Sequence, residues 1–247
     1  MKYRITSETK VVDNITLHRI ECVTAFGDVE CGEKGGWIES GKNLSQCGNA
    51  WVRDNAIVSG NTWVRENATV SGNAVVSDNA VVSDNAMVRG NAWVRGNAWV
   101  RGNAIVSGYA RVSGKAVVGD NAVVSDNAWV GGYARVRENA MVNDNAVVRE
   151  NAIVSGNAVV SDNAMVRENA DYIVFKNWWS SGRYFTWTRS NNKWKVGCFY
   201  GSGEELIAKA YKDSEKSGRE YERVVNYVND ILKEENNDNG NRNKREG

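Results

Sequence analysis

Arginines and tryptophans recur at intervals of six residues in the segment MVRGNAWVRGNAWVRGNA, residues 87–104. Arg89, Arg95 and Arg101 are each followed by glycine, whereas most other arginines in this part of the chain are followed by Asp or Glu. A guanidinium without an adjacent acid can bind a phosphate or carboxylate through paired hydrogen bonds, and an indole ring can stack on a planar group. The pattern therefore indicates a site for a planar, anionic ligand if the fold brings these side chains together.

These residues belong to a repeat that runs without insertion from Asn49 to Glu168. It consists of twenty hexads of the form N-A-x-V-x-x. The fourth residue of every hexad is Val, and the second is Ala in all hexads but one, which has Thr62. Asn opens every hexad except those that begin at Tyr109, Lys115 and Tyr133. A strict period of six excludes a heptad coiled coil and the 3.6-residue period of an α-helix.

Each A-x-V triplet predicts a short strand in which Ala and Val face one side and the middle residue faces the other. The x-x-N segment predicts a corner, with Asn in the left-handed backbone conformation that it tolerates better than most residues. Alternation of short strands and corners is typical of a parallel β-helix. Its core would be a narrow column of stacked Val and Ala.

The repeat resembles the hexapeptide-repeat family of left-handed parallel β-helices. The segment VSGNTW, residues 58–63, and its neighbours match that family's pattern of an aliphatic residue with a small residue four places later. The place after Val is usually Arg or Ser here, where the family often has Gly, Ala or an acid. The resemblance covers residues 49–168 and implies three hexads per coil and a left-handed winding. Eighteen residues per coil then give about 6.7 coils, or a rod roughly 32 Å long at ~4.8 Å between strands.

Three hexads per coil place the outward middle residues in three vertical stacks. The stacks are Trp51, Thr69, Met87, Ile105, Val123, Met141 and Val159; Ile57, Val75, Trp93, Arg111, Trp129, Val147 and Met165; and Trp63, Val81, Trp99, Val117, Arg135 and Ile153. Seventeen of these twenty residues are apolar, which exceeds the exposed patch that a soluble monomer tolerates. We therefore expect a homo-oligomer, for which the resemblance favours a trimer first and a dimer second.

The same register places Arg89, Arg95 and Arg101 on three different faces of a single coil. It also predicts that Arg111 stacks between the indole rings of Trp93 and Trp129. The candidate ligand-binding residues are Arg89, Trp93, Arg95, Trp99, Arg101, Tyr109, Arg111 and Trp129. Cross-strand Trp–Arg stacking can also stabilise a β-surface without any ligand, so two interpretations stay open. Subunit association would convert the exposed belt into a groove between chains.

Enzymatic activity is not expected. Many hexapeptide-repeat proteins are acyltransferases, and the resemblance implies that such an enzyme would need a histidine base near the coils and commonly a loop between hexads. The single histidine, His18, lies in the predicted strand ITLHRIECV, and no cysteine lies between Cys47 and Cys198. Acyl transfer with His18 as the base is the last of three alternatives.

The composition limits the class of protein. With 247 residues, a net charge of +1 and 42 % hydrophobic content, the chain can form one or two folded units but has no general basic field for nucleic acid. It shows neither an apolar leader nor the ~18 apolar residues of a membrane span, so we expect a cytoplasmic protein without a membrane partner. Four cysteines without a CxxC pair favour reduced thiols, no metal and no cofactor.

Other segments flank the hexapeptide repeat, which we assign to residues 49–170. Residues 1–48 predict two alternating strands and irregular first coils, in which Ile38 and Leu44 keep the spacing of six. Residues 171–235 predict a small α+β domain, with three antiparallel strands (DYIVFK, RYFTWTR and KWKVGCFY) and two helices. The helices are indicated by capping-box pairs and by an apolar stripe: Ser202 with Glu205, Ser217 with Glu220, and Tyr221, Val224, Val225, Val228, Ile231 and Leu232. Residues 236–247 predict a disordered tail.

Aromatic and basic residues alternate in residues 172–200, a pattern that can stack single-stranded nucleic acid, although a core or a docking surface is favoured. The chain as a whole resembles uncharacterised bacterial and phage hexapeptide-repeat proteins with a small C-terminal domain. The resemblance rests on the residues Gly35 to Glu39, Asn43 to Gln46, Gly48 to Val52 and Gly197 to Leu206. We expect a non-catalytic oligomer that sequesters an anionic, nucleotide-like ligand at the Arg/Trp belt between subunits, as phage counter-defence. The alternative is a structural or protein-binding scaffold with a host protein as partner.

Overall fold

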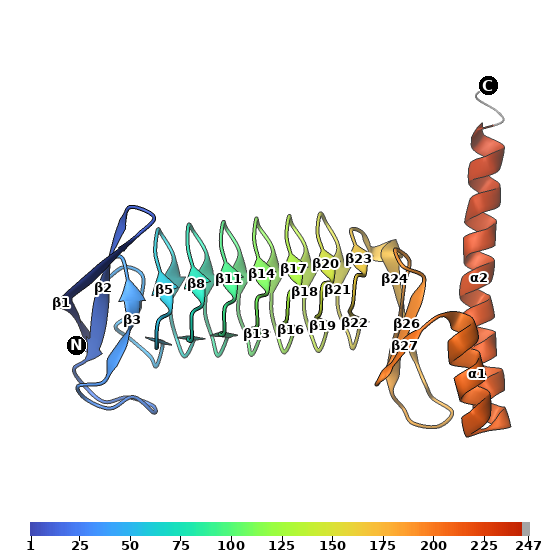
Figure 1. The fold of residues 1–247 in the computed structure, drawn as a ribbon, viewed down its shortest axis with the longest axis horizontal. Helices are drawn as coiled ribbons and strands as arrows, with labels where there is room; N and C mark the ends of the chain where they lie inside the picture. The colour runs from blue at the N-terminus through green and yellow to red at the C-terminus, as the bar shows by residue number, and fades with distance from the viewer. Residues whose placement is uncertain (244–247) are drawn as a thin grey trace. The chain divides into compact units, whose positions relative to one another are not determined.

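The computed structural model describes residues 1–243, and the side chains of residues 1–237. The chain forms two compact units, which are described separately (Figure 1). The first contains Met1–Ile173 and Thr188–Asn191; the second contains Val174–Trp187 and the chain from Asn192 on. Among the described residues, no helix has the length and apolar character needed to cross a membrane.

The repeat forms a parallel β-solenoid of about seven turns, as the period of six predicts. The first face contains β4 (Trp51–Val52), β7 (Thr69–Val70), β10 (Met87–Val88), β13 (Ile105–Val106), β16 (Val123–Val124), β19 (Met141–Val142) and β22 (Val159–Val160). The second contains β5 (Ile57–Val58), β8 (Val75–Val76), β11 (Trp93–Val94), β14 (Arg111–Val112), β17 (Trp129–Val130), β20 (Val147–Val148) and β23 (Met165–Val166). The third contains β6 (Trp63–Val64), β9 (Val81–Val82), β12 (Trp99–Val100), β15 (Val117–Val118), β18 (Arg135–Val136) and β21 (Ile153–Val154). The three hexads per coil and the three outward stacks are confirmed, whereas the left-handed winding stays a prediction.

The solenoid core is the expected column of small side chains. Every Ala from Ala50 to Ala164 and every Val from Val52 to Val166 in the repeat positions is at most 1 % exposed. Because each buried Val contributes about 1.5–3 kcal/mol, the twenty valines together stabilise the solenoid, whose interior contains few other side chains. One outward residue differs from the others: Trp51 is buried, with its ring in edge contact with Tyr3 and Phe26.

The corners correct one prediction. No Asn of the repeat, all of which the structure describes, has a positive φ; the preceding Gly, Asp or Glu takes that conformation, as at Asp84 (φ 58) and Gly90 (φ 72). Glycine has no Cβ to strain there. Where the corner residue is an acid, a hydrogen bond offsets the cost of the left-handed conformation: the Asp84 carboxylate accepts the N–H of Gly102, one coil further on, at 2.8 Å. That hydrogen bond is the main reason why the pKa of Asp84 lies below its usual value.

The repeat asparagines instead form ladders along the corners. In one ladder Asn67 Nδ2 donates to Asn85 Oδ1 at 3.1 Å, and Asn85 Nδ2 donates to Asn103 Oδ1 at 3.1 Å. Each side chain thus serves as donor to one coil and acceptor from another. The strict recurrence of Asn therefore reflects side-chain hydrogen bonding between coils rather than backbone conformation.

The N-terminal segment closes one end of the solenoid. Strands β1 (Tyr3–Val12) and β2 (Ile15–Cys22) form a hairpin, and β3 (Lys34–Ile38) pairs antiparallel with β2 and parallel with β5. The predicted spacing of six is confirmed, since Ile38 lies beside Val58 and Leu44 bridges to Val64. Side-chain donors satisfy carbonyls of the first coil: Lys2 Nζ donates to Ala50 O at 2.7 Å, and Asn43 Nδ2 donates to Gly60 O at 2.9 Å.

The C-terminal region follows a short 3-10 turn, η1 (Asn169–Asp171), and contains an antiparallel sheet and two helices. The sheet has four strands rather than the expected three: β24 (Tyr172–Lys176), β25 (Tyr184–Thr188), β26 (Lys193–Val196) and β27 (Phe199–Gly201). The single strand predicted for KWKVGCFY is wrong, because Gly197 (φ 55) turns it into the hairpin β26–β27. Aromatic rings in this sheet form a core, with Phe185, Trp187 and Trp194 at most 2 % exposed, so these three cannot stack on nucleic acid.

Helices α1 (Gly203–Asp213) and α2 (Glu215–Asn243) complete this region. The capping box at the start of α1 is confirmed, with Ser202 N–H donating to the Glu205 carboxylate at 2.7 Å. The capping box predicted at Ser217 is wrong: Ser217 lies inside α2, and its N–H donates to Ser214 Oγ. Helix α2 also continues through residues 236–243, where disorder is predicted, because these residues extend a helix already formed from Glu215 and extension needs no new nucleus. The last four residues of that predicted tail, 244–247, lie outside the described part.

Candidate functional site

The predicted belt residues lie on the solenoid as their spacing requires. Arg89 follows β10 on the first face, and Trp99 and Arg101 lie on the third face, in and after β12. The other five lie on or beside the second face: Trp93, Arg95, Tyr109, Arg111 and Trp129. The solenoid therefore separates three of the eight residues from the rest and brings five together around β11, β14 and β17, which are adjacent in Figure 1.

Four of these five residues line one surface hollow of about 570 Å³, which we call the arginine–tryptophan hollow. Its lining is Arg95, Tyr109, Arg111, Asn127, Trp129 and Val147. Tyr109 and Trp129 are 64 % and 41 % exposed, so both rings are available to a ligand. The lining contains two guanidinium groups and no acid.

The arginines of the hollow are free of acidic partners. Among the described residues, neither Arg95 nor Arg111 forms an ion pair, whereas Arg65, in the place after Val, pairs with Glu66 at 3.1 Å. The Arg111 side chain lies between Trp93 and Trp129 in the strand register, but in the described structure it stacks on neither ring. Only Arg95 approaches an indole there, 6.0 Å from the centre of the Trp93 ring, which is the limit of a cation–π contact.

The expected guanidinium–indole stack is absent from the described residues because the Trp129 ring is turned aside, over Gly131 of its own coil and toward Ser113 of the preceding coil. Trp129 Nε1 donates to Ser113 Oγ at 3.0 Å, and the ring lies over Gly131. A Cβ on Gly131 would lie 2.9 Å from Trp129 Nε1, so no larger residue fits beneath the ring in this position. The guanidinium of Arg111 is therefore left free to bind an anion.

A departure from the repeat consensus also contributes to the hollow. Tyr109 stands where Asn opens other hexads, and it interrupts the ladder that joins Asn73 to Asn91 below and Asn127 to Asn145 above. Asn127 Nδ2 donates to Asn145 at 3.3 Å, but its Oδ1 has no donor from the coil of Tyr109. The hollow thus gains a phenol ring and an amide oxygen, and the solenoid loses hydrogen bonds at this corner.

A second hollow of about 390 Å³ adjoins the first. It lies between the turn of the β1–β2 hairpin and the second face, and its lining is Val12, Asp13, Ile15, Leu17, Ile57, Ser59, Gly60, Val75, Ser77, Asp78, Trp93 and Arg95. Arg95 lines both hollows, whereas Trp93 lines only the second. Sequence reasoning missed the contribution of the hairpin, because no periodic signal links residues 12–17 to the repeat.

The remaining predicted residues have different surroundings. Arg101 lines a third-face hollow of about 400 Å³ with Arg135 and Arg137, and its side chain lies over Gly119, where an added Cβ would be 3.6 Å from the Arg101 side chain. Gly119 and Gly131 occupy the place after Val that is Arg or Ser in most hexads, and both lie under a larger side chain. Glycine at position 131 is thus a departure from the repeat that could have indicated the position of the Trp129 ring, but the repeat pattern alone did not identify it.

The residues considered for catalysis lie elsewhere. His18 lies in β2, where it pairs with Thr9 and Ile38 and lines neither hollow of the second face. Cys22 is buried, and Cys31, Cys47 and Cys198 are exposed free thiols. In the part of the chain that the structure describes, no three His, Cys, Asp or Glu side chains are grouped closely enough to hold a metal ion.

The arrangement on the second face can hold an anion by two guanidinium groups and a planar group by a phenol or an indole ring. Comparison with models of known protein families gives no match, and comparison with curated proteins gives none either.

Proposed function

We propose that the protein is a non-catalytic binding protein that holds a planar, anionic, nucleotide-like ligand in the arginine–tryptophan hollow. The observation that carries this proposal is the pair of unpaired guanidinium groups, Arg95 and Arg111, beside the exposed rings of Tyr109 and Trp129. Such arginines bind phosphate or carboxylate oxygens in pairs. The rings contact the planar part of the ligand, and the free Asn127 Oδ1 accepts a hydrogen bond from it.

The departure at Tyr109 favours this interpretation over surface stabilisation alone. If the belt served only to stabilise the β-surface, Asn at this corner would continue the ladder and add two hydrogen bonds. Likewise, stabilisation by cross-strand stacking would place Arg111 on an indole ring, which it does not contact. Binding of a ligand would account both for the interrupted ladder at Tyr109 and for the position of the Arg111 side chain.

Self-association is part of the proposal. Exposed apolar residues occur on all three faces: Trp63, Met87, Trp93, Trp99, Trp129 and Met141, each between 37 % and 48 % exposed. A trimer, favoured by the resemblance to hexapeptide-repeat proteins, or a dimer would cover such residues and enclose the hollow between subunits. Sequestration of a host signal by a phage protein fits this arrangement, on the strength of that resemblance.

The test combines native mass spectrometry with calorimetric titration of the purified full chain with mono- and dinucleotides. We expect an oligomer that carries a releasable small mass, and a nucleotide affinity that falls about a hundredfold in the double variant Arg95→Ala/Arg111→Ala, since two charged hydrogen-bonding groups contribute about 3 kcal/mol. The matched control is Arg65→Ala, which removes an ion-paired arginine from the place in the hexad that Arg95 occupies. An unchanged affinity in the double variant would refute the site.

A protein-binding scaffold is the second candidate, because the same exposed apolar residues fit a protein partner. It predicts bare oligomers in native mass spectrometry and a partner protein captured by the solenoid faces. Acyl transfer ranks last: it predicts binding of coenzyme A and loss of turnover in His18→Ala.

A further inference from the structure

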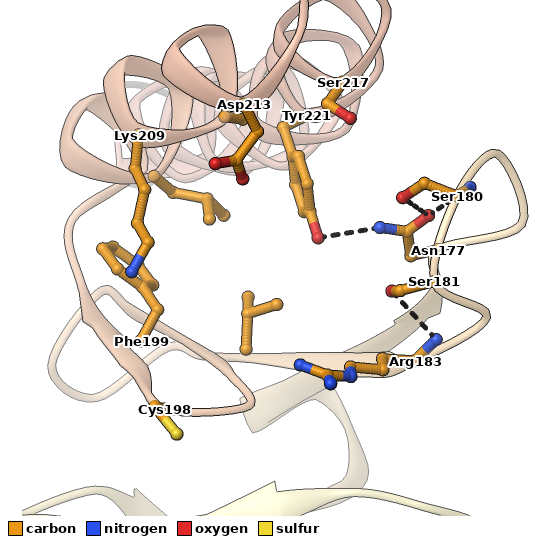
Figure 2. A pocket seen from close by; sticks show the side chains of 13 residues that line it. Asn177, Ser180, Ser181, Arg183, Cys198, Phe199, Lys209, Asp213, Ser217 and Tyr221 are labelled. Atoms are coloured by element: carbon orange, nitrogen blue, oxygen red, sulfur yellow. Dashed lines mark hydrogen bonds between the residues drawn. The ribbon is translucent and has the colours of Figure 1, made fainter.

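The C-terminal unit contains a cavity of about 270 Å³ that takes no part in the proposed function. Figure 2 shows it between the helices on one side and the loop before β25 and the β26–β27 hairpin on the other. Its lining is Asn177, Ser180, Ser181, Arg183, Val196, Cys198, Phe199, Leu206, Lys209, Ala210, Asp213, Ser217 and Tyr221. All of these residues belong to one compact unit, so the cavity is formed within it.

Three charged side chains line the cavity, and none is neutralised by the described residues. Arg183, Lys209 and Asp213 form no ion pair there, although Lys209 and Asp213 are one turn apart on α1. Lys209 instead extends over the Phe199 ring, with its Nζ 5.6 Å from the ring centre. In Figure 2 the Asp213 carboxylate points into the cavity from the helices, and the Arg183 guanidinium approaches from the opposite wall. All three are exposed residues, so their charges stay hydrated and each can exchange water for an opposite charge of a ligand.

Hydroxyl groups around these charges are arranged as donors. Tyr221 OH accepts from Asn177 Nδ2 at 3.1 Å, which leaves its own proton for another acceptor. Burial is the main reason why the pKa of Tyr221 is raised, so this proton is retained near neutral pH. Ser181 Oγ accepts from the N–H of Arg183 at 3.3 Å and likewise keeps its proton free.

The remaining wall is apolar and limits the size of an occupant. Val196, Phe199, Leu206 and Ala210 form this wall, which suits a short methylene chain. A volume of about 270 Å³ lies below the range typical of drug-sized ligands and suits a molecule of roughly ten heavy atoms. The two cations and the carboxylate match a ligand with two negative charges and one positive charge, because each charge of such a ligand meets an opposite charge of the lining.

We propose that this cavity binds a small zwitterion with two negative charges and one positive charge, the chemistry shared by acidic amino acids and phosphorylated amines. Arg183 and Lys209 hold the two negative charges, and Asp213 holds the ammonium group. Tyr221 and Ser181 donate to the ligand oxygens. The binding site is separate from the arginine–tryptophan hollow, so either proposal can fail without the other.

Calorimetric titration of the full chain with L-glutamate, L-aspartate and O-phosphoethanolamine tests this proposal and separates the two sources. We expect saturable binding of one of the three with a Kd on the order of 0.1–1 mM. Arg183→Gln should weaken binding about tenfold or more, because it removes a charge-assisted contact. The control, Lys212→Met, removes an exposed lysine of α1 that does not line the cavity, and should leave binding unchanged.

Glutarate, which lacks the ammonium group of glutamate, distinguishes loss of the Asp213 contact from misfolding, because a misfolded variant would lose affinity for both ligands. If glutamate binds, Asp213→Asn should weaken it about tenfold but leave glutarate unchanged or bound more tightly, since a repulsive carboxylate is removed. If phosphoethanolamine binds, ethyl phosphate takes the place of glutarate in the same comparison. The absence of saturable binding for all three probes, or a preference for the amine that Asp213→Asn leaves intact, would overturn the proposal.

Discussion

The corner at Gly90 allows a quantitative test of why the repeat alternates glycine with acids. Gly90 has a φ of 72, and a Cβ there would lie 3.1 Å from the nitrogen and the oxygen of Gly108, one coil further on. The left-handed conformation costs an L-residue about 1–2 kcal/mol, and the lower entropy of the unfolded chain returns about 0.5–1 kcal/mol. With a small further cost for the close contact, we expect Gly90→Ala to lower the free energy of unfolding by about 1 kcal/mol.

An aspartate at the same corner should recover most of that loss. Among the described residues, no acceptor takes the N–H of Gly108, whereas the N–H of Gly72 is accepted by Asp54 Oδ2 at 2.8 Å. The carboxylate of Gly90→Asp would reach the Gly108 N–H in the same way and contribute about 1 kcal/mol. Gly90→Asp should therefore match the parent within about 0.5 kcal/mol, although its side chain is larger than that of alanine.

Urea denaturation followed by circular dichroism measures these differences. The matched control is Gly119→Ala, since Gly119 lies in the solenoid without a positive φ and its nearest neighbour would be 3.6 Å from a Cβ. We expect that variant to be neutral or stabilised by about 0.4–1 kcal/mol. If Gly90→Asp were as destabilised as Gly90→Ala, the corner carboxylates would not act as acceptors between coils, and our account of the acids in the repeat would be wrong.

Three further outcomes follow from the structure. Val94→Ala should lower the free energy of unfolding by about 2 kcal/mol in urea denaturation, because the buried column cannot collapse around a missing pair of methyl groups. Gly131→Ala should turn the Trp129 ring away from Ser113, visible as a shift in tryptophan emission, with a stability change below about 0.5 kcal/mol because the site is on the surface. Burial lowers the pKa of Lys2 to about 8, whereas the ordinary lysine pKa of 10.5 applies in the unfolded chain. Between these two pH values the unfolded chain therefore binds a proton that the folded chain does not. The unfolding free energy of the parent, relative to Lys2→Met, should therefore rise between about pH 8 and about pH 10; a flat difference would contradict the buried position of this ammonium.

The solenoid was predictable because one short pattern determines both its core and its register. Each Ala and Val pair must face inward, and three hexads per coil then place Trp93, Arg111 and Trp129 in adjacent strands, as the structure has them. The corner conformation was not predictable from the tendency of Asn alone. Asn forms ladders between coils, and the preceding Gly, Asp or Glu bears the left-handed backbone instead.

The parts without a repeat were harder to predict, because their contacts join distant segments. The hollow beside Trp93 depends on a hairpin turn at Asp13, and nothing in the alternation of its strands indicates where that turn meets the solenoid. In the C-terminal unit, Gly197 divides a predicted strand, and the cavity joins Arg183 to Asp213 across thirty positions. Local propensity describes each segment but not which side chains converge.

The departures from the hexad consensus are the most informative residues for function. The consensus alone supplies the core and the ladders, so a departure that removes a hydrogen bond needs a separate explanation. Lys115 and Tyr133 compensate each other, since Lys115 Nζ donates to Tyr133 OH at 3.4 Å and lies 5.0 Å from its ring centre. Tyr109 has no such partner in the next coil, where Asn127 stands, and it lies in the hollow with two unpaired arginines. The uncompensated departure therefore coincides with the unpaired charges, and the second face of the solenoid is where a ligand should be sought first.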